Sequence, residues 1–190
     1  SYKHQGPLDM RMDNRLKHTA ADLLNSLSVD ELAKALKDLS DEPDHMEIAG
    51  QIVSERAINP ITKTSQLVDL IFTGKDKTVK EWKHRQRTSK TPLLHPAART
   101  FQALRILVND ELGCLKELLR LAPYCLRPGG RIGIISFHSA EDRIVKHSFR
   151  DGFRNGTYKA VSDDVIVPQI KEINSNPRSA SAKFRWAVKS

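Results

Sequence analysis

Four consecutive residues, Ser136 to Ser139, combine side-chain types that could stack on a planar ligand and hydrogen-bond to it. Phe137 offers an aromatic face, while His138 and the two serines have acceptor capacity. The apolar run from Ile132 to Phe137 reads as a buried parallel strand, and Phe137, His138 and Ser139 lie at its carboxyl end. Open α/β sheets place their ligands at the carboxyl ends of such strands, so a site is expected here.

A purely structural interpretation of the same residues is also open. Ser139 and Asp142 have the spacing of a capping box, Glu141 favours a helix N-terminus, and His138 could serve only to bond backbone. Leu-x-Pro-Gly-Gly-Arg, which starts at Leu126, predicts a helix stop and a tight turn before the strand. After the strand, apolar residues at helical spacing predict a helix with one buried face.

A set of short amphipathic helices is expected upstream, over residues 19–90. Thr19 with Asp22, and Ser28 with Glu31, are capping boxes. Apolar residues at helical spacing then predict a third helix that ends before Asn59-Pro60 and a fourth that begins after Thr64. The apolar positions of these two helices are Ile48, Ala49, Ile52 and Val53, and Leu67, Leu70 and Ile71.

A basic stretch with few apolar residues runs from Lys75 to Lys90 and contains seven positive and two negative residues. It is expected to be a flexible loop that follows an RNA backbone through phosphate contacts and stacks a base on Trp82. A solvated linker is the alternative. The charged residues are Lys75, Lys77, Lys80, Lys83, Arg85, Arg87 and Lys90, against Asp76 and Glu81.

One long helix is predicted beyond His95, because an apolar stripe recurs at helical spacing and is of the kind that packs on a sheet. A neighbouring polar stripe, Gln102, Arg105 and Asn109, would meet a cleft edge or would be ordinary boundary residues that bond nearby backbone. Two further strands are expected, over residues 158–167 and 182–189. The apolar stripe consists of Phe101, Leu104, Val108, Leu112, Leu115 and Leu119.

Composition narrows the choice of partner. The chain has 190 residues, 39% hydrophobic content and a net charge of +8 with pI ≈ 9.6. This charge favours an anionic partner, and RNA fits better than a membrane because no apolar stretch approaches transmembrane length. Cys114 and Cys125 lack CxxC spacing and clustered histidines, so no metal site is expected and a reducing compartment is the default.

Four blocks, in this order along the chain, resemble the MraW-type S-adenosylmethionine-dependent small-subunit (16S) rRNA cytosine-N4 methyltransferases. The resemblance implies N4-methylation of a cytidine, with S-adenosylmethionine as cofactor and small-subunit rRNA as partner. It also implies a bacterial cytoplasmic or organellar location. The blocks are Gly6–Asp13 (GPLDMRMD), His95–Leu112 (HPAARTFQALRILVNDEL), Leu126–Lys146 (LRPGGRIGIISFHSAEDRIVK) and Asn176–Arg185 (NPRSASAKFR).

The resemblance also implies a fold class: α/β, with a partial class I (Rossmann-like) methyltransferase sheet and an all-helical insertion domain. The family's opening strand, Gly-rich turn and second strand ending in an acid do not precede GPLDMRMD. The chain is therefore expected to be a C-terminal portion that lacks the main cofactor-binding half. Alone, it would bind S-adenosylmethionine weakly or not at all, and it could form a homodimer or pair with a complementing N-terminal fragment.

The expected domains are a linker over 1–18, a helical RNA-binding insertion over 19–90 and the C-terminal half of the methyltransferase domain over 91–190. The expected base pocket consists of Ser136, Phe137 and His138. A truncated, non-catalytic RNA-binding or ribosome-associated module is the alternative function. The expected RNA contacts are Lys80, Trp82, Lys83, Arg85, Arg87, Arg99, Arg105 and Arg178.

Overall fold

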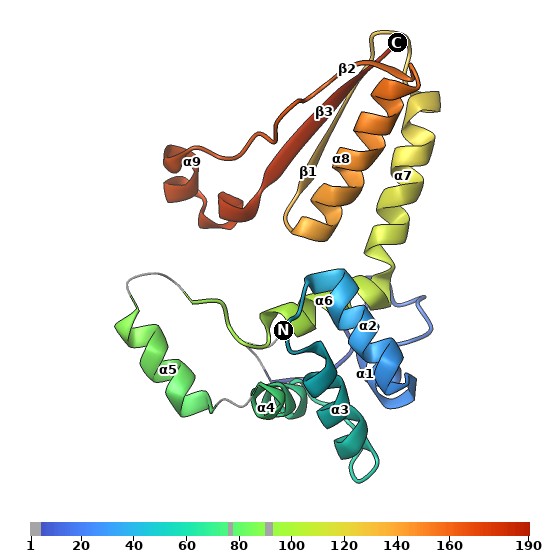
Figure 1. The fold of residues 1–190 in the computed structure, drawn as a ribbon. Coiled ribbons are helices and arrows are strands. Elements are labelled where there is room, and N and C mark those ends of the chain that lie inside the picture. The colour runs from blue at the N-terminus through green and yellow to red at the C-terminus, as the bar shows by residue number, and fades with distance from the viewer. Residues whose placement is uncertain (1–4, 76–77, 90–92) are drawn as a thin grey trace. The chain divides into compact units, whose positions relative to one another are not determined.

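The computed structural model describes residues 5–75, 78–89 and 93–190, and they form two compact units. The first unit ends at Asp110 and the second extends from Glu111 to Ser190 (Figure 1). This division falls inside the segment predicted as the C-terminal half of the methyltransferase domain, because α6 packs with the helices that precede it.

Helices alone make up the regular structure described in the first unit, and local signals explain where several of them begin. The predicted capping boxes of Thr19 with Asp22 and of Ser28 with Glu31 are confirmed, as are the third and fourth helices. The helices are α1 (Ala20–Ser26), α2 (Val29–Ser40), α3 (His45–Arg56), α4 (Thr64–Gly74), α5 (Val79–Thr88) and α6 (Ala98–Asn109).

The core of this unit forms where α2 packs against α3 and α6, and α3 packs against α4. The N-terminal segment belongs to the same core: Leu8 is buried, and its backbone N–H donates to the carbonyl of Thr62 at 2.9 Å. Part of the predicted linker over 1–18 is thus built into the helical unit. The largest buried side chains include Leu24, Leu32, Leu36, Ile48, Ile52, Ile61, Leu67, Ile71 and Leu104.

The second unit combines helices with a small antiparallel sheet of order β1-β3-β2 (Figure 1). The predicted strands after α8 are confirmed as β2 and β3, although β2 is shorter than expected. The elements are α7 (Glu111–Cys125), β1 (Arg131–Ser136), α8 (Ser139–Arg154), β2 (Tyr158–Val161), α9 (Ile170–Ser175), a 3-10 helix (Pro177–Ser181) and β3 (Lys183–Lys189).

The core of the second unit lies between α8, α7 and the sheet. Val145 and Phe149 of α8 pack with Leu119 of α7 and with Tyr158 and Ala187 of the sheet. The rings of Phe149 and Tyr158 meet edge to face, with their centroids 5.7 Å apart. The predicted apolar face of the helix after β1 therefore covers the sheet.

The prediction of a buried parallel strand at β1 is wrong for the described chain. Among the residues described, β1 pairs only with β3, in antiparallel register, with Ile132 opposite Ala187 and Ser136 opposite Lys183. Its residues alternate in burial, and Ile135 is exposed. The sheet described is thus a small antiparallel one, because the only other strands in the described residues, β2 and β3, both run antiparallel to their neighbours.

The prediction of one long helix beyond His95 is also wrong. Asp110 adopts a left-handed conformation (φ 46°) that ends α6, and α7 begins at the next residue. Asp tolerates this conformation better than most residues, so the helix can end here although the apolar spacing continues along the sequence. Phe101 of α6 joins the helical core, whereas Leu119 of α7 joins the core beneath the sheet.

Candidate functional site

The carboxylate of Glu141 holds the turn between β1 and α8 through a hydrogen bond to its backbone. His138 caps α8, and its Nδ1 accepts a hydrogen bond from the backbone N–H of Glu141 at 3.4 Å. The Glu141 side chain in turn accepts from the backbone N–H of Phe137 at 3.0 Å. Burial alone raises the pKa of the Glu141 carboxyl, but the neighbouring His138 side chain and the hydrogen bond from the Phe137 amide outweigh it and lower the pKa from its ordinary value.

The predicted capping box of Ser139 with Asp142 is wrong, because the cap lies one residue earlier, at His138. Asp142 instead accepts hydrogen bonds from Nε and Nη2 of Arg185 on β3, at 2.7 and 3.1 Å. Both side chains are largely buried, and the hydrogen bond with Arg185 lowers the pKa of Asp142. This ion pair ties the first turn of α8 to the middle of the sheet.

The structure brings the three predicted base-pocket residues together, but it gives them different surroundings. Ser136 is buried, and its hydroxyl donates to the carbonyl of Lys183 at 3.4 Å. His138 is largely buried as the cap of α8. Phe137 is 54% exposed, so of the three it presents the open surface that stacking on a ligand requires.

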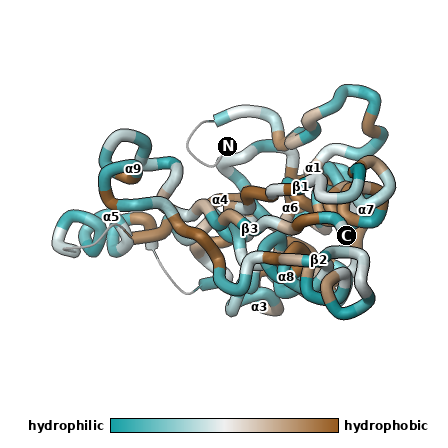
Figure 2. The backbone as a smooth tube through the Cα atoms, turned by 90° about the horizontal axis from the view of Figure 1, so that it is seen from above, coloured by the Kyte–Doolittle hydropathy of each residue, from teal (hydrophilic) through white to brown (hydrophobic). Residues whose placement is uncertain are grey.

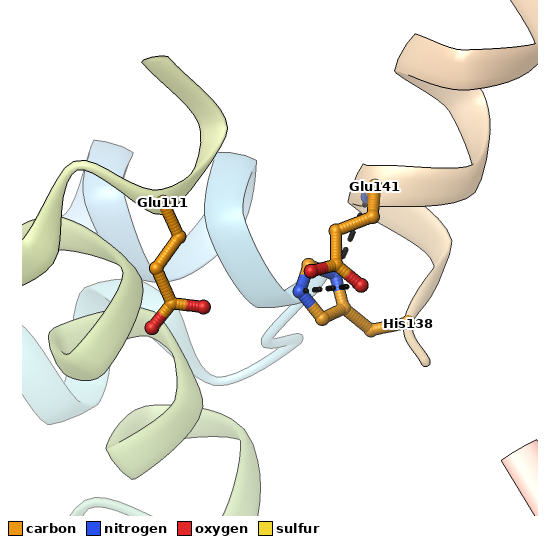
Figure 3. A group of neighbouring side chains, drawn as sticks. All are labelled: Glu111, His138 and Glu141. Atoms are coloured by element: carbon orange, nitrogen blue, oxygen red, sulfur yellow. Dashed lines mark hydrogen bonds and ion pairs between the residues drawn. The ribbon is translucent and has the colours of Figure 1, made fainter. Parts of the chain in front are cut away.

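Two glutamates, Glu111 and Glu141, lie close to His138. Sequence reasoning did not identify Glu111. Ligand-type atoms of Glu111, His138 and Glu141 lie within 4.8 Å of one another (Figure 3). Because Nδ1 of His138 accepts the cap hydrogen bond, the proton of the neutral ring lies on Nε2, which makes no hydrogen bond and faces Oε2 of Glu141 at 3.4 Å. A nitrogen that carries a proton offers no lone pair to a metal, so this arrangement favours hydrogen-bond donation.

The predicted flexible basic loop is wrong over residues 79–88, which form α5. A capping box starts the helix: Thr78 Oγ1 accepts from the N–H of Glu81, and the Glu81 carboxylate accepts from the N–H of Thr78. Figure 2 shows α5 as mainly hydrophilic. Its basic side chains, Lys80, Lys83, Arg85 and Arg87, are exposed, whereas Asp76, Lys77 and Lys90 lie outside the described residues.

Trp82 is packed on its neighbours, which does not match a solvated linker. Its ring centroid lies 4.5 Å from that of His95 and 6.4 Å from that of Phe72, with interplanar angles of 67° and 68°. The indole N–H is buried and has no hydrogen-bond partner in the described part of the chain. The aromatic side chain therefore fixes α5 against the segment that leads into α6.

A hollow of about 1070 Å³ lies beside α5, within the helical unit. Its walls come from α5, from the turn before α3 and from the segment that leads into α6. Three of the predicted RNA-contacting cations, Lys80, Arg85 and Arg99, line it together with Trp82. Lys83 and Arg87 also lie on α5 but do not line this hollow; they line a smaller one of about 520 Å³, which Lys80 borders as well.

Lys75, part of the predicted basic stretch, is not free to contact RNA. Its ammonium group is buried in an ion pair with the fully buried carboxylate of Glu42, and it also lies 3.0 Å from Oδ2 of Asp44. Sequence reasoning did not identify Glu42, because its partner is distant in the chain and nothing local marks the acid as buried. The Glu42 carboxylate also accepts from the backbone N–H of Asp44 at 3.4 Å and from the hydroxyl of Thr100 at 3.5 Å.

The other predicted RNA contacts are dispersed. Arg99 is exposed and donates to the carbonyl of Asp41 at 3.1 Å; Arg105 is exposed on α6, and Arg178 is exposed in the 3-10 helix of the second unit. In the polar stripe, the Asn109 amide donates to the carbonyl of Met10 at 2.9 Å, as a boundary residue would. None of the described helices is long and apolar enough to span a membrane.

Comparison with known proteins gives a consistent result over the whole chain. The MraW methylase family matches residues 1–190. Three proteins called ribosomal RNA small subunit methyltransferase H, or H 1, are 43% (Crocosphaera subtropica), 41% (Synechocystis sp.) and 44% (Lachnoclostridium phytofermentans) identical to this chain. These matches cover 98%, 100% and 100% of the chain but 54%, 57% and 50% of the relatives, so the chain spans about half of their length. The chain belongs to the MraW methylase family.

Proposed function

We propose that this chain is part of a methyltransferase that transfers a methyl group from S-adenosylmethionine to N4 of a cytidine in small-subunit rRNA. The family match over residues 1–190, with relatives called small-subunit rRNA methyltransferases, is the observation that carries the proposal. The net charge of +8 and the basic surface of α5 support an RNA substrate.

Base positioning is the part of the reaction that we assign to the β1–α8 junction. The exocyclic amine of cytosine is a weak nucleophile, because its lone pair is delocalised into the ring. An enzyme helps by taking the base out of its stack and holding the amine in line with the methyl group. The exposed ring of Phe137 would provide the stacking face, and Glu141 would hold it in place through the Phe137 amide.

The cofactor supplies the methyl group, but the junction described here does not fit it. The Phe137 amide already donates to Glu141, and His138 occupies the cap of α8. Cofactors of this kind are usually bound by free backbone amides of a Gly-rich turn and by an acid that holds the ribose. We therefore assign no step through the cofactor to these residues and expect the chain alone to bind it weakly or not at all.

RNA binding is assigned mainly to the helical unit, through the exposed cations of α5 and α6. A helical unit with its own core could also act as a non-catalytic RNA-binding or ribosome-associated module, and the hollow beside α5 favours this second candidate. The two candidates differ in a single property. Only the first requires that the chain support methyl transfer when it is joined to a cofactor-binding segment.

A chimera tests this difference. The chain would replace the matching segment of the Crocosphaera subtropica relative, and transfer of labelled methyl groups to unmodified small ribosomal subunits would be measured. The methyltransferase proposal predicts activity well above that of the relative with its matching segment deleted. RNA binding without methyl transfer would favour the non-catalytic module.

Phe137→Leu in the active chimera tests the base platform. Loss of stacking should slow methylation by the equivalent of about 1 to 3 kcal/mol in activation free energy, the usual range for a base stacked on an aromatic side chain. Thermal stability should change little, because the ring is 54% exposed. An unaltered methylation rate in a stable variant would remove Phe137 from the site.

A further inference from the structure

We propose that the hollow beside α5 holds one unstacked nucleotide of the RNA strand, with the phosphate bound by Lys80 and Arg85 and the base held beside Trp82. The proposal rests on the RNA substrate proposed above, and it assigns the hollow to a single nucleotide. It concerns the helical unit alone, because every residue that lines the hollow lies in that unit.

Size and lining suit a nucleotide. The hollow measures about 1070 Å³, slightly above the usual upper range of about 1000 Å³ for small-molecule sites. Trp82, Leu94 and Pro96 provide apolar walls, while cations lie on α5 and at the start of α6. Apolar walls beside positive charge suit the two chemically different ends of a nucleotide, its base and its phosphate.

The charges around the hollow leave a net positive field. Two acids line it, Asp44 and Glu81, but each is already engaged. Asp44 lies 3.0 Å from the Lys75 ammonium, and the Glu81 carboxylate caps α5 through Thr78. The exposed cations Lys80, Arg85 and Arg99 are not countered in this way by the lining acids, which favours an anionic ligand.

The aromatic wall is fixed before any ligand arrives. Trp82 packs edge-on against His95, and Nδ1 of His95 accepts a hydrogen bond from the N–H of Ala97 at 3.1 Å, at the start of α6. A wall that is already ordered loses less conformational entropy on binding.

The proposal separates two kinds of RNA contact on one helix. A strand that only follows positive charge would use all four cations of α5 alike. A nucleotide inside the hollow would depend on Lys80 and Arg85, which line it, far more than on Lys83 and Arg87, which do not. The helix therefore carries its own matched control, with the same number of charges in each pair.

The experiment compares Lys80→Ala/Arg85→Ala with Lys83→Ala/Arg87→Ala. Both variants remove two exposed positive charges, so thermal melts should show that both remain folded. Affinity would be measured by fluorescence anisotropy with a labelled single-stranded oligoribonucleotide at fixed salt. We expect the first pair to lose about tenfold more affinity than the second, since the phosphate contact also positions the stacked base.

A second probe tests the base directly. An oligomer with the same sugar and phosphate groups but no bases should bind the wild-type chain about 5- to 150-fold more weakly than the RNA, given the usual energy of base stacking. Equal losses for both charge pairs, or equal affinity for the baseless oligomer, would overturn the nucleotide site while RNA binding stood. If the wild-type chain failed to bind RNA, the nucleotide site and the proposed RNA-binding role of the helical unit would both fall.

Discussion

Replacing Lys75 with methionine should destabilise the helical unit, because it leaves the carboxylate of Glu42 buried without a positive partner. The Lys75 side chain is 7% exposed and that of Glu42 is 0% exposed, so water cannot replace the lost charge. Methionine fills the volume of the lysine stem, and the change therefore isolates the electrostatic effect from the loss of packing.

The size of the effect follows from this burial. Removing one partner of a buried ion pair usually costs about 3 to 5 kcal/mol. The second contact of Lys75 adds little, because Asp44 is partly exposed and such pairs contribute about 0 to 1 kcal/mol. The expected loss is thus a large fraction of the about 5 to 15 kcal/mol that stabilises a typical domain.

Urea unfolding followed by circular dichroism would measure this loss. Lys34→Met on α2 is the matched control, since Lys34 is exposed and its replacement should change the unfolding free energy by less than about 0.5 kcal/mol. Adding Glu42→Leu to Lys75→Met should recover part of the loss, because the double variant no longer buries an unpaired charge. A loss below about 1 kcal/mol for Lys75→Met alone would refute the reasoning.

Three further predictions concern stability and cofactor binding. Arg185 lowers the pKa of Asp142, so this pair should stabilise the second unit at pH values above 3.8, the ordinary pKa of an aspartate. The stabilisation should be lost as the pH falls through the lower pKa of the folded state. Asp142→Asn should remove that part of the pH dependence in acid titrations followed by fluorescence. Gly152→Ala should cost about 1 to 3 kcal/mol, because the new Cβ would lie 2.5 Å from the Tyr158 ring, whereas Gly50→Ala meets no atom and should stabilise α3 by up to about 1 kcal/mol; thermal melts that rank the two variants the other way would contradict the packing. Calorimetry should detect no tight binding of S-adenosylmethionine to the chain alone, and micromolar affinity would count against this expectation.

Local signals in the sequence were sufficient for most of the helical unit. Capping boxes and apolar spacing predicted α1 to α4, because these signals act within a few residues of one another. The capping box of Thr78 with Glu81 could have predicted α5 in the same way, but the density of positive charge was interpreted as a loop. In α5 the capping box starts a strongly polar helix, and Trp82 packs one side of it on Phe72 and His95.

Sequence reasoning failed at residues whose partners lie far away in the chain. Both His138 with Glu141 and Ser139 with Asp142 have the spacing of a cap, and the choice follows from Arg185, which binds Asp142 from β3. The burial of Glu42 likewise depends on an ammonium group from the end of α4. Such pairings are invisible to local patterns, since they arise only once the chain has packed.

The candidate site was predicted in part. The sequence predicted that the three base-pocket residues lie where a strand ends, and the structure places them at the end of β1. Their role in base binding stays a prediction. It did not anticipate that Ser136 and His138 would be largely buried while Phe137 stayed open. Exposure at a turn depends on contacts that form only when the chain has folded, and here the Phe137 amide bonds back to Glu141.

Nucleoside analysis by mass spectrometry tests the central claim most directly. Small-subunit rRNA would be methylated by the chimera that carries this chain, digested to nucleosides and compared with rRNA treated with the segment-deleted relative. The account predicts a new N4-methylated cytidine, in an amount that falls when Phe137 is replaced by leucine. Methylation on a ring carbon or on another base, or no methylation by a folded chimera that binds RNA, would contradict it.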